Sequence, residues 1–127
     1  MTRSDFCPYV RDLANRMGLR DWAFEIPRTQ PDDTEANAAI FCAFGRKHGE
    51  IRLSDSFLED STPEEQRQTL CHELAHALFA PMHQFLRDTL DEHAFKAYLL
   101  LFEYGIDATA DALAPHMPLP LTTAKAE

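Results

Sequence analysis

The stretch from Thr62 to Pro81 constrains the fold of this chain most strongly, because it predicts a helix with a sharply defined start. Thr62, Pro63 and Glu65 match a capping box, in which the threonine and glutamate side chains bond to each other's backbone N–H groups. Proline is pre-organised for the first helical position. Proline also disfavours a helical conformation in the preceding residue, so we expect the helix to end near Ala80, where Pro81 stops it.

Three ionisable side chains interrupt the apolar part of this helix, in the segment CHELAHALFA. His72 and His76 are four residues apart, so their rings lie about one turn apart on the same helical face. Two imidazoles placed this way can share one tetrahedral metal ion, whereas Glu73 is rotated by about 100° and reaches a water on the metal instead. Burying these groups without a role would be costly. The pattern therefore predicts a zinc site at His72 and His76, with Glu73 as the catalytic base.

A catalytic zinc site needs a third protein ligand and an open fourth position. The candidates in the sequence are His83, Glu92, His93, Glu103 and Asp107. Spacing favours Glu103, because Asp107 follows it by one helical turn and could accept the N–H of a ligating histidine. A straight helix from residue 84 would carry Glu103 about 30 Å away, so this choice requires the chain to reverse near residues 89–92. Without that reversal, Glu92 or His93 becomes the better ligand.

The remaining elements are expected to be short. A helix capped by Ser4 should end near Gly18, and a helical piece is expected over residues 84–88. Strand-like runs cover residues 21–26, 38–44 and 50–54, and the last two should form a hairpin through GRKHG. Thr89 or Asp91 should cap a long last helix that reaches Leu113. These elements predict an α+β fold.

The HELAH motif with Glu103 and Asp107 downstream resembles the gluzincin metallopeptidases. The resemblance implies that His72, His76 and Glu103 bind zinc, that Asp107 supports a ligating histidine, and that Glu73 is the general base. The order of elements is similar to minimal members of phages and mobile elements and to ImmA/IrrE-like peptidases. For the family's oxyanion-stabilising His or Tyr the sequence leaves five candidates open: His48, His83, His93, Tyr98 and Tyr104.

The resemblance implies a minimal zincin-like fold, with an N-terminal helix, a small antiparallel three-stranded sheet, the HExxH helix and a C-terminal ligand helix. Residues 1–115 should form this single domain, and residues 116–127 a mobile tail. The implied activity is that of a zinc-dependent metallopeptidase acting on a protein or peptide substrate. The alternative is a regulatory protein that keeps the scaffold and binds without catalysis.

Charge and cysteine content narrow the expected partners and location. The net charge is −9, with 12 basic and 21 acidic residues, which argues against nucleic acid and anionic membranes as partners. The three cysteines contain no CxxC pair, so neither a disulfide framework nor a thiolate zinc site is expected. With no apolar leader in the first residues, we expect a cytoplasmic protein. The pattern specifies neither a substrate sequence nor an oligomeric state.

Overall fold

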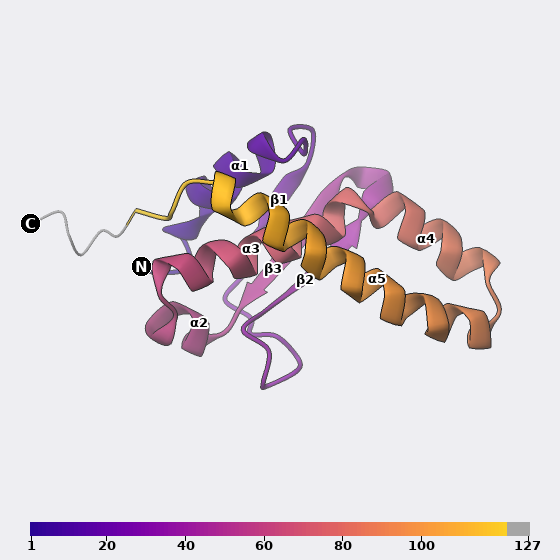
Figure 1. The fold of residues 1–127 in the computed structure, drawn as a ribbon. Coiled ribbons are helices and arrows are strands. Elements are labelled where there is room, and N and C mark those ends of the chain that lie inside the picture. Colours follow the sequence, from indigo (N-terminus) through magenta and orange to yellow (C-terminus); the bar gives the residue numbers. More distant parts are fainter. Residues whose placement is uncertain (122–127) are drawn as a thin grey trace, which may run out of the picture.

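The computed structural model describes residues 1–121 of the 127-residue chain. Its elements in chain order are α1 (Phe6–Arg16), β1 (Ala23–Glu25), β2 (Ala38–Ala43), the 3₁₀ turn η1 (Phe44–Arg46), β3 (His48–Leu53), α2 (Asp55–Asp60), α3 (Pro63–Leu78), α4 (Ala80–Thr89), α5 (Glu92–Leu113) and the 3₁₀ turn η2 (Ala114–His116) (Figure 1). The predicted α+β class and zincin-like order of elements are confirmed.

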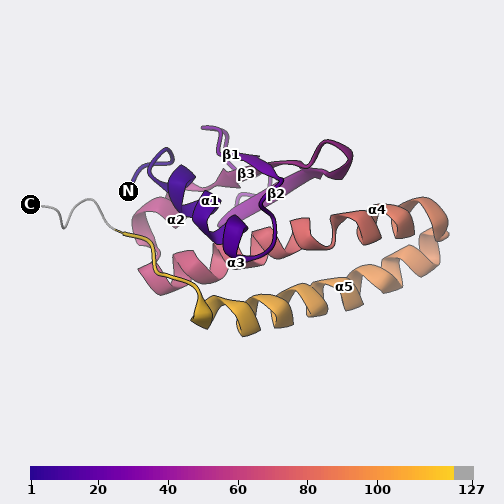
Figure 2. The ribbon, with the colours of Figure 1, turned by 90° about the horizontal axis from the view of Figure 1, so that it is seen from above.

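Helix α3 is the middle layer of the molecule. It packs against the sheet and α1 on one side and against α5 on the other, as the view from above shows (Figure 2). Leu70 and Leu74 of α3 are fully buried with Ile51 and Leu53 of β3. Because α3 carries the HELAH segment, its histidines and glutamate lie where the sheet and α5 meet.

The sheet is mixed rather than antiparallel, which corrects the predicted pairing. Its strand order is β1-β3-β2, with β2 antiparallel to β3 and β1 parallel to β3. Residues 26–37 carry the chain from β1 to β2 at the opposite edge of the sheet. The hairpin after β2 then leads into β3, which lies between β1 and β2. Consequently β2 is an edge strand, and its free edge faces away from β3.

The capping box of α3 forms as predicted. The Thr62 Oγ1 accepts the Glu65 N–H at 3.1 Å, and the Glu65 carboxylate accepts the Thr62 N–H at 2.8 Å. Helix α3 ends at Leu78, close to the predicted end near Ala80, but Pro81 does not stop it, because Pro81 lies in the first turn of α4. Proline is tolerated there because N–H groups of a first turn have no intrahelical partner.

Other helix boundaries differ from expectation in informative ways. Ser4 does not cap α1, since Asp5 occupies the N-cap position without a side-chain cap bond. Gly18 does end this helix region, with a positive φ of 84°. Helix α2 was not expected from the sequence, but the Ser54 hydroxyl caps it by accepting the Phe57 N–H at 2.9 Å.

The required chain reversal lies between α4 and α5 and is confirmed. Asp91 is the N-cap of α5, and its carboxylate accepts the Ala94 N–H at 2.8 Å. Helix α4 is longer than the predicted piece over residues 84–88, and it projects beyond the sheet with the first half of α5 (Figure 1). No helix in residues 1–121 is long and apolar enough to cross a membrane.

The predicted tail of residues 116–127 begins against α1 and α3. The Tyr9 hydroxyl donates to the Pro118 carbonyl at 2.7 Å, and the Arg67 guanidinium donates to the Met117 carbonyl at 3.1 Å. Residues 122–127 of this tail lie outside the described residues. The domain boundary at residue 115 stays a prediction.

We expect Thr62→Ala to lower the free energy of unfolding by about 1 kcal/mol, because it removes the side-chain acceptor of the capping box. Thr62→Ser keeps that acceptor and should remain close to the wild type. Urea unfolding of the two variants beside the wild type measures the difference. Equal losses in both variants would show that the hydroxyl does not stabilise α3.

Candidate metal site

His72 and His76 lie on the face of α3 that packs against α5. Their ring centroids are 5.2 Å apart, and both side chains are partly buried. Phe102 of α5 packs against the His76 ring at a centroid distance of 5.6 Å. Because α5 runs back along α3, it carries Glu103 to the two imidazoles, although Glu103 lies 27 positions after His76 and 31 after His72 in the chain.

One carboxylate faces both imidazoles. Glu103 Oε1 is 3.6 Å from His76 Nε2, and Glu103 Oε2 is 3.9 Å from His72 Nε2. Two ligand atoms on one tetrahedral zinc, each about 2.1 Å from the ion, would be about 3.4 Å apart. The donor atoms of the three residues all lie within 4.8 Å of one another, so this group could hold a metal ion.

The Asp107 carboxylate lies close to one imidazole. Its Oδ1 lies 3.0 Å from His72 Nδ1, one helical turn beyond Glu103. A hydrogen bond from Nδ1 to a carboxylate leaves Nε2 unprotonated and therefore able to bind a cation. Nε2 is also the His72 atom that faces Glu103, so a neutral ring protonated on Nδ1 would turn its unprotonated nitrogen toward the other donors.

The other ligand candidates are not part of this group. Glu92 and His93 are exposed in the first turn of α5, at the far end of the α4–α5 hairpin. His83 lies on α4, where its Nδ1 is 3.1 Å from the hydroxyl oxygen of Tyr98. Of the sequence candidates, the structure brings together Glu103 and Asp107 with the two motif histidines.

Burial sets the protonation of the groups in the metal-free site. Glu73 is only 7% exposed, and burial with the nearby Glu103 charge raises its pKa to about 8. Burial and the neighbouring His72 lower the pKa of His76 to about 4, so His76 is neutral at pH 7 and its ring nitrogens can bind a metal. A carboxyl group with a pKa near neutrality is suited to proton transfer.

A cavity opens on each side of the three donors. The Glu73 cavity, of about 250 Å³, is lined by Asn37, Ala38, Gln68, Thr69, His72, Glu73 and Asp107. The His76 cavity, of about 270 Å³, is lined by Ile40, Phe41, Cys42, His76, Ala80, His83, Gln84, Arg87 and Phe102. Ala38 at the start of β2 borders the first cavity, and Ile40, Phe41 and Cys42 of the same strand border the second. The edge strand therefore runs past the metal group, which is formed by His72, His76 and Glu103.

Sequence reasoning missed the polar residues beside the histidines. Gln68 and Thr69 precede His72 by four and three residues, so helical periodicity alone places them on its face. The Gln68 amide donates to Asp111 at 2.8 Å, which adds a further polar contact between α3 and α5 near the His72–Asp107 pair.

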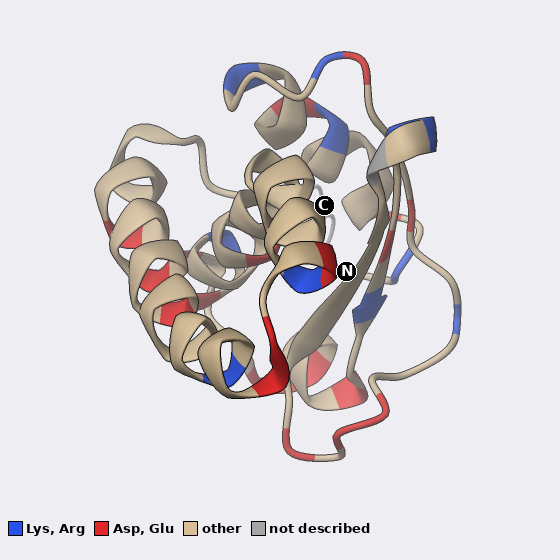
Figure 3. Cartoon of the chain, turned by 90° about the vertical axis from the view of Figure 1, so that its right-hand side faces the viewer, with Lys and Arg blue, Asp and Glu red and all other residues tan. Residues whose placement is uncertain are grey.

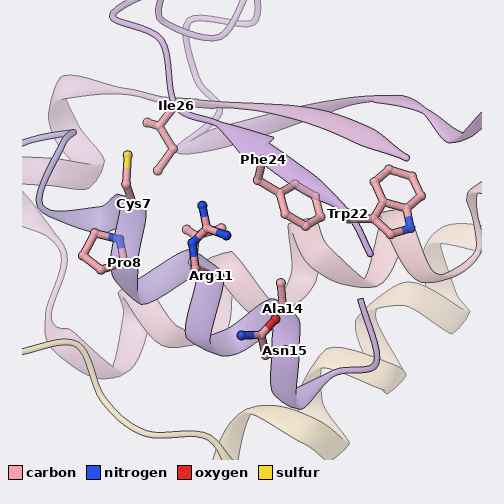
Figure 4. A pocket seen from close by; sticks show the side chains of 9 residues that line it. Cys7, Pro8, Arg11, Ala14, Asn15, Trp22, Phe24 and Ile26 are labelled. Carbon is pink, nitrogen blue, oxygen red and sulfur yellow. The ribbon is translucent and has the colours of Figure 1, made fainter. Parts of the chain in front are cut away.

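A further cavity, of about 280 Å³, lies between α1 and β1 and contains none of the metal-site residues. Trp22 and Phe24 form one wall as stacked rings 5.7 Å apart, and Arg11 extends from α1 toward that wall (Figure 4). A Cβ on Gly49 would lie 2.7 Å from the Phe24 ring, so glycine in β3 is what allows this ring to lie against the sheet.

The model of the SprT-like family matches residues 20–100. The chain belongs to the SprT-like family. This family is zincin-like and metallopeptidase-associated, in agreement with the fold and with the donor group. No curated protein and no solved structure matches this SprT-like chain. The matched segment contains HELAH and ends before Glu103 and Asp107. The assignment of these two carboxylates to the site therefore rests on their distances to the two histidines.

Substitution of the donors should separate ligands from bystanders. With Zn²⁺ as the probe, His72→Ala, His76→Ala and Glu103→Ala should each abolish tight binding. Asp107→Ala should weaken it about 10–100-fold by releasing the His72 ring. Competition with a chromophoric chelator measures the affinities, and Glu92→Ala on the same helix is the control. Unchanged affinity in Glu103→Ala would assign the third ligand to another residue.

Glu73→Gln should stabilise the metal-free protein in a pH-dependent way. The pKa of Glu73 is higher in the folded chain than in the unfolded chain. The stability that protonated Glu73 contributes to the folded wild type is therefore complete below about pH 4.5 and is lost as the pH rises through about 8. The variant should therefore match the wild type near pH 4.5 and exceed it above pH 8, by on the order of a few kcal/mol. Thermal unfolding in chelator at both pH values tests this, and a pH-independent difference would contradict it.

Proposed function

We propose that this SprT-like protein is a zinc-dependent metallopeptidase that hydrolyses peptide bonds in protein or peptide substrates. The observation that carries the proposal is the buried Glu73 carboxyl group beside three convergent donors, two imidazoles and one carboxylate. Nitrogen and oxygen donors in this combination suit zinc, and three protein ligands leave a fourth position for the reaction.

Each residue of the site has a proposed task. His72, His76 and Glu103 would hold the zinc, which when bound activates a water molecule and polarises the peptide carbonyl. Glu73 would accept the proton of the attacking water and deliver it to the leaving amine. Its ionised form is favoured once a cation offsets the charge of Glu103, because an opposite charge nearby lowers a carboxyl pKa.

Two further features support a peptide as the substrate. The free edge of β2 passes both cavities, so an extended peptide could add to it by main-chain hydrogen bonds. The net charge of −9 makes nucleic acid and anionic membranes poor partners.

Cys7, Cys42 and Cys71 are free thiols, which is compatible with the proposed cytoplasmic location.

Glu73→Gln should retain zinc and lose peptide cleavage, since the amide cannot accept the proton. We expect kcat to fall by at least about 10²-fold. Incubation of zinc-loaded protein with a mixed pool of proteins, followed by mass spectrometry of new termini, measures the loss. Glu64→Gln, an exposed position in the first turn of α3, is the matched control and should keep full activity.

The same experiment separates catalysis from binding alone. Cleavage that Glu73→Gln leaves unchanged would remove Glu73 from the mechanism. Zinc binding without cleavage by the wild type would favour the regulatory alternative.

A further inference from the structure

One face of α4 lines the His76 cavity with polar side chains. Ala80, His83, Gln84 and Arg87 follow the spacing of a single helical face. A helix that packs only for stability would turn apolar residues to its partner. Three consecutive polar members of this face instead border a cavity that also contains the ligand candidate His76.

Arg87 brings an unpaired positive charge to this cavity. Within residues 1–121 its guanidinium forms no ion pair, and the neighbouring Asp88 carboxylate accepts the Gln84 amide at 3.1 Å. The side chain is exposed, so its five N–H donors are available to a ligand. A guanidinium matches a carboxylate in geometry and charge.

His83 is a second donor, and its ring is held in place. The Tyr98 hydroxyl lies 3.1 Å from His83 Nδ1, and Phe102 packs against the ring at a centroid distance of 4.8 Å. We assign the proton of this contact to Tyr98, because a phenol is a stronger donor than a neutral imidazole; Tyr98 then donates to Nδ1 and the His83 proton lies on Nε2. The Nε2–H group is then the one available to a ligand in the cavity.

The two cavities differ in charge. Glu73 and Asp107 line the Glu73 cavity, and acidic positions recur along α5 beside it (Figure 3). A substrate carboxylate would be repelled there. In the His76 cavity Arg87 and His83 supply donors, while Ile40 and Phe41 supply apolar walls for the stem of a side chain.

We propose that the His76 cavity is a substrate subsite for an acidic side chain next to the cleaved peptide bond, bound by Arg87 and His83. The inference rests on the proposed peptidase function and specifies its substrate class. At about 270 Å³ the cavity has room for one aspartate or glutamate side chain.

Matched peptides test the charge of the subsite. A peptide that the wild type cleaves is remade with Glu, Gln or Lys at each position around the bond. At one position, zinc-loaded wild type should cleave the Glu peptide at least about tenfold faster in kcat/KM than the Lys peptide. Arg87→Glu should reverse this preference, and Arg87→Gln should abolish it. Arg20→Glu, an exposed arginine that lines neither cavity, should preserve it.

Binding gives a readout that does not need turnover. With the zinc-loaded Glu73→Gln protein, fluorescence anisotropy should show about tenfold tighter binding of the Glu peptide than of the Lys peptide. Salt should reduce this ratio, since the contact is ionic and exposed. Arg87→Glu in this background should reverse the order.

Two substitutions distinguish hydrogen bonding from packing at His83. His83→Gln keeps an N–H donor and loses the ring, whereas His83→Phe keeps the ring and loses the donor. The subsite predicts that the preference for Glu survives better in His83→Gln. The reverse order would remove His83 from the subsite.

The outcomes separate the two proposals. Absence of cleavage by the zinc-loaded wild type would overturn the peptidase function and the subsite with it. Cleavage without a preference for an acidic side chain, or a preference that Arg87→Glu leaves intact, would overturn the subsite alone.

Discussion

The packing of α5 along α3 is the contact on which the metal group depends. Phe102 and Ile106 of α5 are buried with Ala75 of α3, so the small alanine lets the two helices approach closely. Glu103 is adjacent to Phe102 and Asp107 to Ile106, and they project next to this apolar contact toward His72 and His76. The apolar contact is a cluster separate from the main core, and it holds the helix that carries Glu103 and Asp107 beside the two histidines.

The same packing makes the metal-free site electrostatically unfavourable. Glu73 and His76 are each held away from their ordinary pKa, mainly because burial disfavours their charged forms. Glu73 is only 7% exposed and His76 is partly buried, although each lines a cavity, so water solvates their charged forms poorly. A cation bound only by the folded chain would offset the charge of Glu103 and add to stability in proportion to its affinity.

The sequence predicted the features that local chemistry controls. The capping box at Thr62, the HELAH face and the reversal at Asp91 each depend on residues within one or two turns. The parallel pairing of β1 with β3 depends instead on where residues 26–37 run across the sheet, which no local pattern specifies. The donor group was predictable only in part. Helical spacing suggested Glu103 and Asp107, but only the packing of α5 on α3 separates Glu92 and His93 from the two histidines.

Pro81 shows how a local rule can hide a pattern of side chains that continues from one helix into the next. If Pro81 ended the motif helix, the side chains before and after it would belong to separate helical faces. In the structure α4 continues nearly in line with α3 after the break at Phe79, so these side chains form one continuous row (Figure 1). Positions 72, 76, 80, 83 and 87 then follow one helical face, from the metal group to the His76 cavity. A proline in a first helical turn costs little, so the chain can interrupt its hydrogen bonds there without changing which side chains face the edge strand. The two histidines of the donor group and the proposed subsite are therefore two parts of one helical face, to which α5 adds Glu103.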